Sequence, residues 1–91
     1  MNKAHYNIQV IGKVQGVWFR KYTKAEAIKM DLKGTVRNKN NGNVYIEVEG
    51  NRVTIENFIN WLYIGSPQSK VAEVIYEVSH YIGYDKFEIM P

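Results

Sequence analysis

The amino-acid sequence predicts an α+β fold in which an antiparallel sheet carries two helices on one face, in the chain order βαββαβ. Two observations predict this fold. Segments with strand-like and helix-like apolar spacing follow one another in that order along the chain. The two middle strands flank Asn40-Asn41-Gly42-Asn43, and Asn and Gly tolerate the positive φ that tight hairpin turns require. Such a sheet needs only one buried face, which two helices can cover.

The first half of the chain begins with a strand and a helix. Tyr6, Ile8 and Val10 alternate with polar residues, which predicts a strand. Helical spacing predicts a helix over residues 19–32, with Gly34 beyond its end. The residues expected on the buried face of this helix are Phe19, Thr23, Ala27 and Met30.

The hairpin strands are expected at Thr35–Lys39 and Val44–Glu49. In the second of these, Val44, Ile46 and Val48 alternate with polar side chains, so one face is buried and the other faces water. The acidic residues of this strand and of the later strand are expected on the solvated sheet face; they are Glu47, Glu49, Glu73 and Glu77.

The second half of the chain supplies another helix and the last strands. Asn51 is expected to cap a helix that ends at Gly65-Ser66-Pro67. Its apolar face consists of Ile55, Phe58, Ile59 and Leu62. A strand is expected over Val71–Val78, and a short segment at Phe87–Ile89 is expected to pair as a fifth strand. Ala72, Val74, Tyr76 and Val78 are expected on one face of the fourth strand.

Composition limits the classes of function. The 91 residues suit one small domain, residues 1–91, and the net charge of +3 with a pI near 9.2 mildly favours anionic ligands. No apolar stretch approaches the roughly 18 residues that cross a bilayer, and no apolar leader follows Met1. Without cysteine the chain has no disulfide and no thiolate metal site. We therefore expect a cytoplasmic monomer with no membrane partner.

The most informative segment is Gly12-Lys13-Val14-Gln15-Gly16-Val17-Trp18-Phe19-Arg20, which joins the first strand to the first helix. Backbone N–H groups in such a loop can converge on an anion, and the positive end of the helix dipole adds to them. Arg20 adds a planar cation that engages two phosphate oxygens at once. We interpret the segment as a phosphoryl cradle; the alternative is an ordinary strand-to-helix connection with a surface arginine.

The cradle lacks side chains for nucleophilic or general-base chemistry. Between Lys13 and Tyr22 there is no Cys, Ser, Thr, His, Asp or Glu, so a reaction here requires direct attack by water. Asn38 shares a strand face with Val36 and is expected to point toward the helices, where its amide could hold that water. The alternative is that Asn38 caps the hairpin turn.

Other candidate residues carry less weight. His5 and His80 are isolated in the sequence and are expected to be structural or solvent-facing. Lys13 and Lys21 flank the loop, where they either attract anions or simply face solvent. Trp18 is expected in the core or at the edge of the loop.

With these residues the chain closely resembles the acylphosphatase family over nearly its whole length. The strongest match is the segment at 12–20, which continues through Lys21-Tyr22-Thr23. The second signature is Gly34-Thr35-Val36-Arg37-Asn38, followed by Gly42-Asn43-Val44. The stretch Gly65-Ser66-Pro67 also fits the family. Two signatures in the right order and separation make the resemblance specific.

The resemblance implies a ferredoxin-like fold and hydrolysis of acyl phosphates to a carboxylate and inorganic phosphate, with neither a metal nor a cofactor. It also implies inorganic phosphate or sulfate as a ligand. In the family, the arginine matching Arg20 and the loop amides bind the phosphoryl group, and the asparagine matching Asn38 positions the attacking water. The loop positions are Gln15, Gly16, Val17, Trp18, Phe19 and Arg20.

The chain departs from the family pattern at three places. Thr35 stands where an aromatic residue is usual, and Asp31 replaces a usual glycine at the helix end. Asp tolerates the left-handed conformation expected there at some cost. The ending Met90-Pro91 lacks the common arginine or aromatic terminus, which puts a stabilising contact from the tail in doubt.

Two other functions fit a small basic βαββαβ domain: RNA binding, and anion binding without turnover. RNA-recognition modules stack bases on aromatic residues of the sheet. Here Tyr45 lies on the same strand face as Glu47 and Glu49, and these carboxylates would repel phosphates. The sequence therefore favours hydrolysis and no nucleic-acid partner.

Overall fold

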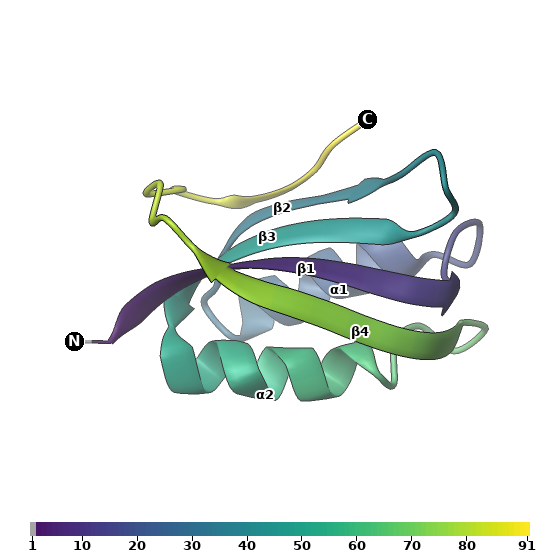
Figure 1. Cartoon of the computed structure of the whole chain (residues 1–91), viewed down its shortest axis with the longest axis horizontal. Helices are drawn as coiled ribbons and strands as arrows, with labels where there is room; N and C mark the ends of the chain where they lie inside the picture. Colours follow the sequence, from purple (N-terminus) through teal and green to yellow (C-terminus); the bar gives the residue numbers. More distant parts are fainter. Residues whose placement is uncertain (1) are drawn as a thin grey trace.

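The computed structural model describes residues 2–91, whose elements follow the predicted order. The strands are β1 (Lys3–Lys13), β2 (Lys33–Asn38), β3 (Val44–Asn51), β4 (Lys70–Ser79) and β5 (Phe87–Ile89), and the helices are α1 (Phe19–Lys29) and α2 (Arg52–Leu62). Both helices cover one face of a five-stranded sheet with the order β4-β1-β3-β2-β5 (Figure 1). This arrangement confirms the predicted ferredoxin-like α+β fold.

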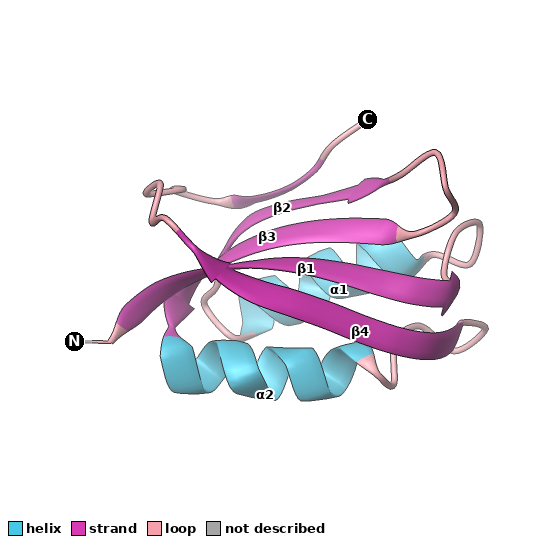
Figure 2. Ribbon diagram, in the orientation of Figure 1, coloured by secondary structure: helices cyan, strands magenta, loops and turns pink. Residues whose placement is uncertain are grey.

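The sheet is mixed because its last strand is parallel to its neighbour. The first four strands pair antiparallel, as predicted, whereas β5 pairs parallel with β2 at the edge opposite β4 (Figure 2). Two backbone hydrogen bonds extend this pairing, from Gly34 N–H to Lys86 O at 3.0 Å and from Met90 N–H to Val36 O at 2.8 Å. To reach β2, the chain between β4 and β5 crosses the sheet on the face away from the helices.

The core lies between the sheet and the two helices. Val44, Ile46 and Val48 are fully buried, as their alternation predicts. The helices contribute the buried side chains Phe19, Ala27, Ile55, Phe58 and Leu62. Asn51 caps α2 as predicted, because its Oδ1 accepts from Val53 N–H at 2.9 Å.

Helix α1 ends at Lys29, three residues before the predicted end at Leu32. Asp31 adopts a left-handed conformation with φ 58°, as the family glycine at this position implies. The chain then turns so that Leu32 N–H donates to Ala27 O at 2.8 Å and the Leu32 side chain is buried. Leu32 therefore packs in the core although it lies beyond the end of the helix. Helical spacing in the sequence does not distinguish such a residue from one inside the helix.

The face of β4 predicted to carry Ala72, Val74, Tyr76 and Val78 is largely exposed. Val74 is buried, whereas Ala72, Tyr76 and Val78 are exposed. The physical reason is the position of β4 at the edge of the sheet, while α2 packs mainly on the neighbouring strands β3 and β1. An edge strand keeps the alternating pattern of a core strand without a helix to cover it.

The prediction that Glu49 faces water is also wrong, because its side chain is only 1% exposed. The carboxylate accepts from the backbone N–H groups of Ile82, Gly83 and Tyr84 at 2.5–2.9 Å and from His5 Nδ1 at 2.7 Å. Burial alone would raise the pKa of Glu49, but these hydrogen bonds outweigh it and lower the pKa below its ordinary value. Glu49 thus holds the segment that crosses the outer sheet face.

The lowered pKa of Glu49 predicts a loss of stability in acid. The stabilisation is complete above the ordinary carboxyl pKa of about 4.5 and is lost as the pH falls through the lower pKa of the folded state. We expect Glu49→Gln to reduce the free energy of unfolding at neutral pH by about 1–3 kcal/mol and to flatten its decline below that pH. Urea unfolding across pH measures both effects, with Glu77→Gln as an exposed control on β4. An acid dependence as steep in Glu49→Gln as in the wild type would contradict this role.

Candidate active site

The loop between β1 and α1 is anchored in the core by alternate side chains. Val14, Val17 and Phe19 are buried, whereas Gly16 and Trp18 between them adopt positive φ values of 73° and 64°. Glycine adopts this conformation freely, but for Trp18 it costs about 1–2 kcal/mol. Strained residues of this kind persist only where the surrounding structure holds them in place, and they concentrate at functional sites.

Helix α1 begins without a cap. Trp18 occupies the N-cap position with no side-chain hydrogen bond, and the first turn contains no acidic residue. Within residues 2–91, the backbone N–H groups of residues 15–20 donate no hydrogen bond. Free N–H groups at a helix N-terminus favour an anion, both as donors and through the helix dipole. The loop is therefore suited to bind a phosphoryl group.

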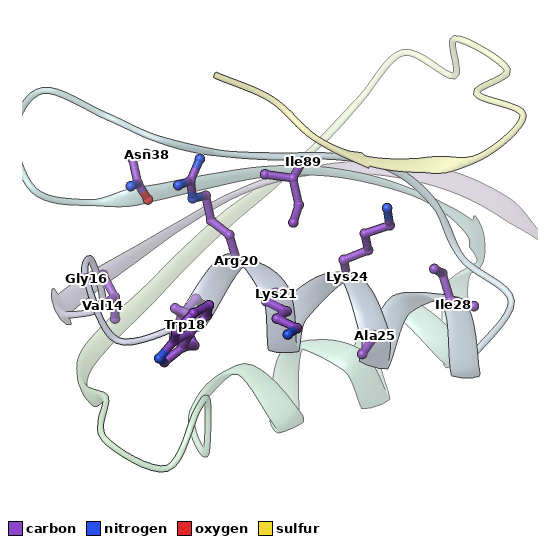
Figure 3. A pocket seen from close by; sticks show the side chains of 11 residues that line it. Val14, Gly16, Trp18, Arg20, Lys21, Lys24, Ala25, Ile28, Asn38 and Ile89 are labelled. Atoms are coloured by element: carbon purple, nitrogen blue, oxygen red, sulfur yellow. The ribbon is translucent and has the colours of Figure 1, made fainter.

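Arg20 and Asn38 line the same cavity of about 820 Å³, into which they point from α1 and from the end of β2 (Figure 3). Arg20 Nη1 donates to Met90 O at 3.2 Å, so the tail contacts the guanidinium although it lacks the usual family terminus. Asn38 Oδ1 is buried and has no hydrogen-bond partner within residues 2–91. The turn is instead capped by Asn41, whose Oδ1 accepts from Asn43 N–H at 3.0 Å.

Gln15 connects the loop to the hairpin that carries Asn38. Its side-chain Nε2 donates to Lys39 O and to Asn43 O, each at 2.8 Å. The sequence indicated Gln15 only as a source of a backbone amide. The side-chain contact joins residues that are far apart in the chain, and no local pattern signals it.

Ser66 holds the loop from the opposite side. Its buried Oγ donates to Val17 O at 2.7 Å, so this carbonyl is held away from the free N–H groups of the loop. Gly65 allows this approach, because a Cβ there would lie 2.6 Å from a ring carbon of Phe19. The sequence indicated Gly65-Ser66-Pro67 as the end of a helix and as a stretch that fits the family, but not its contact with the loop.

The remaining candidates take different positions. Trp18 is 68% exposed, at the edge of the loop rather than in the core, and Lys21 Nζ lies 5.3 Å from the centre of its ring. His5 is buried beside Glu49 and His80 is exposed; neither lines the cavity. In the described part of the chain, no group of three or more His, Cys, Asp or Glu residues could hold a metal. Across residues 2–91, no helix has the length and apolarity needed to span a membrane.

The βαββαβ sandwich brings free loop amides, an arginine and an amide side chain to one cavity. The protein therefore belongs to the class of small α+β proteins suited to a phosphoryl ligand. The family model described as Acylphosphatase matches residues 6–89. The acylphosphatase of Bacillus licheniformis is 42% identical over 85 residues, which are 92% of this chain and 94% of that protein.

Solved structures agree with the sequence match. An acylphosphatase from Coxiella burnetii has a TM-score of 0.94 at 34% identity and covers 98% of this chain and 94% of its own. Acylphosphatase from Bacillus subtilis has a TM-score of 0.92 at 38% identity, with 96% and 98% covered. The chain therefore belongs to the acylphosphatase family, and it is an enzyme that hydrolyses acyl phosphates.

The contacts of Gln15 predict a role in holding the site together. We expect Gln15→Ala to lower the free energy of unfolding by about 1–3 kcal/mol, because two hydrogen bonds are lost. It should also weaken phosphate binding, because the loop is no longer fixed to the hairpin. Urea unfolding and phosphate inhibition measure the two effects, and Gln68→Ala, an exposed glutamine after α2, is the control. If phosphate affinity is unchanged in Gln15→Ala, the hairpin contact does not position the loop.

Proposed function

We propose that the backbone amides of residues 15–20 and the guanidinium of Arg20 bind the phosphoryl group, and that Asn38 holds the water that attacks it. The observation that carries this proposal is the unpartnered Oδ1 of Asn38, which is buried at the cavity that Arg20 also lines. A buried acceptor without a partner is costly unless a ligand or water satisfies it. The free loop amides supply matching donors for the anion.

The reaction balances without an enzyme nucleophile. The water oxygen forms a bond to phosphorus as the bond from phosphorus to the acyl oxygen breaks, and the carboxylate leaves with the electron pair. A carboxylate is a good leaving group and needs no protonation. The proton of the water passes to a phosphoryl oxygen, since none of the residues that line the cavity is a carboxylate or a histidine. The protein contributes positioning and charge stabilisation.

Several narrower statements belong to the same proposal. Residues 1–91 act as one domain, which the family match over residues 6–89 supports. Inorganic phosphate and sulfate bind the cradle as ligands. The protein acts as a cytoplasmic monomer without a nucleic-acid partner. The carboxylates of Glu47 on β3 and Glu77 on β4, the two strands that flank β1, make the sheet a poor surface for RNA. Light scattering and a filter-binding assay with RNA test the last two statements.

The role of Arg20 is tested by Arg20→Lys. The ammonium is a compact point charge and cannot engage two phosphoryl oxygens as the guanidinium does. We expect kcat/KM for benzoyl phosphate to fall by about 100-fold or more, together with weaker inhibition by inorganic phosphate. Arg52→Lys, at an exposed arginine that begins α2, serves as the control. Turnover by Arg20→Lys within a few-fold of the wild type would rule out this role.

The role of Asn38 is tested by Asn38→Ala. Because Asn38 holds the water and not the anion, kcat should fall by about 100-fold while inhibition by phosphate stays close to that of the wild type. The fold should survive with a loss of about 1–2 kcal/mol at most. Asn60→Ala, at an exposed position of α2, is the matched control. Equal losses of turnover and of phosphate affinity would mean that Asn38 shapes the cradle itself.

A further inference from the structure

The cavity is larger than the phosphoryl cradle requires. Its volume of about 820 Å³ lies in the range that accommodates a whole small molecule. Beyond Arg20 and Asn38 it extends along α1, where the lining residues are Lys21, Lys24, Ala25 and Ile28, with Ile89 of β5 opposite. Lys21 and Ala25 point away from Ile89, whereas Lys24 points toward its side of the cavity (Figure 3). Ile28 and Ile89 are apolar, so the part of the cavity that they line suits a carbon skeleton.

Lys24 is the charged side chain that points toward this apolar part of the cavity (Figure 3). Its side chain is only half-exposed, and within residues 2–91 no carboxylate lies within ion-pair distance of its ammonium. Lys21, one turn earlier, already lies 5.3 Å from the ring centre of Trp18. A partly desolvated ammonium without a counter-ion attracts an anion more strongly than a fully exposed lysine does.

The spacing of Arg20 and Lys24 places two cations along one ligand. The residues are four apart on α1, so they share a helix face with about 6 Å of rise between them. In Figure 3 both side chains extend from α1 toward the β2 and β5 side of the cavity. One molecule with its phosphoryl group at Arg20 is therefore able to place a second anion at Lys24, with the acyl skeleton between the two.

We propose that this part of the cavity binds the acyl group, and that Lys24 selects acyl phosphates that carry a second negative charge at the far end of that group. This inference rests on the proposed role of Arg20 and the loop, which defines the direction of the substrate. Ile28 and Ile89 contact the carbon skeleton, and the ammonium of Lys24 pairs with the distal anion. The preferred substrates are thus monophosphates of diacids.

The experiment compares two substrates that differ only in the distal charge. They are para-carboxybenzoyl phosphate and para-carbamoylbenzoyl phosphate, whose rigid rings also prevent intramolecular cyclisation. The measured quantity is the ratio of their kcat/KM values. We expect Lys24→Met to lower this ratio about fivefold relative to the wild type, and Lys24→Glu to lower it further. Lys24→Arg should retain the ratio, since it keeps the charge.

Two controls make the result specific. Lys29→Met removes the same charge from an exposed position of α1 that does not line the cavity, and should leave the ratio unchanged. Raising the salt concentration from about 0.01 M to about 1 M should reduce the wild-type ratio, because the Debye length falls from about 30 Å to about 3 Å. If both substrates are hydrolysed and the ratio is as high in Lys24→Met as in the wild type, the selection by Lys24 is overturned while the proposed cradle is not. Failure of the wild type to hydrolyse either substrate would overturn the proposed cradle as well.

Discussion

The arrangement of the site depends on how the segment at 14–19 divides its groups between the core and the cavity. Val14, Val17 and Phe19 are buried, and their packing holds Gly16 and Trp18 in left-handed conformations. A chain with this alternation cannot make the backbone hydrogen bonds of a strand or of a helix. Its N–H groups therefore remain free, and hydrophobic burial compensates for the cost of keeping them so. The proposed anion site is thus a consequence of core packing.

A site without a general base must rely on rigid geometry, and three distant segments provide it. Ser66 holds the carbonyl of Val17, Gln15 holds the hairpin, and Met90 O holds the guanidinium of Arg20. In the proposed site, each contact fixes a group that would otherwise compete with the phosphoryl oxygens for the donors or move away from the ligand. Preorganised donors of this kind need no reorganisation during the reaction, which is where their catalytic contribution arises.

The sequence predicted the parts of the protein that depend on local spacing. Strand alternation in β3, the cap at Asn51 and the shared face of Val36 and Asn38 all follow from neighbours in the chain. The parts that were missed depend on tertiary position. Val78 alternates like a core residue but lies on an edge strand, and Glu49 looks like a solvated residue but meets three N–H groups from 33 to 35 residues away. No local sequence pattern distinguishes a buried side chain from an exposed one at these positions, because burial depends on which distant segment packs against them.

The buried carboxylate on the outer face is connected to the cavity on the other face through the short fifth strand. Glu49 fixes the backbone at residues 82–84, and after two intervening residues the chain enters β5, which has three paired residues of its own. So short a strand has few hydrogen bonds to hold its register. Ile89 lines the cavity and Met90 contacts Arg20, so their placement depends on the segment that Glu49 secures. The polar cluster on one face of the sheet therefore supports the wall of the site on the other.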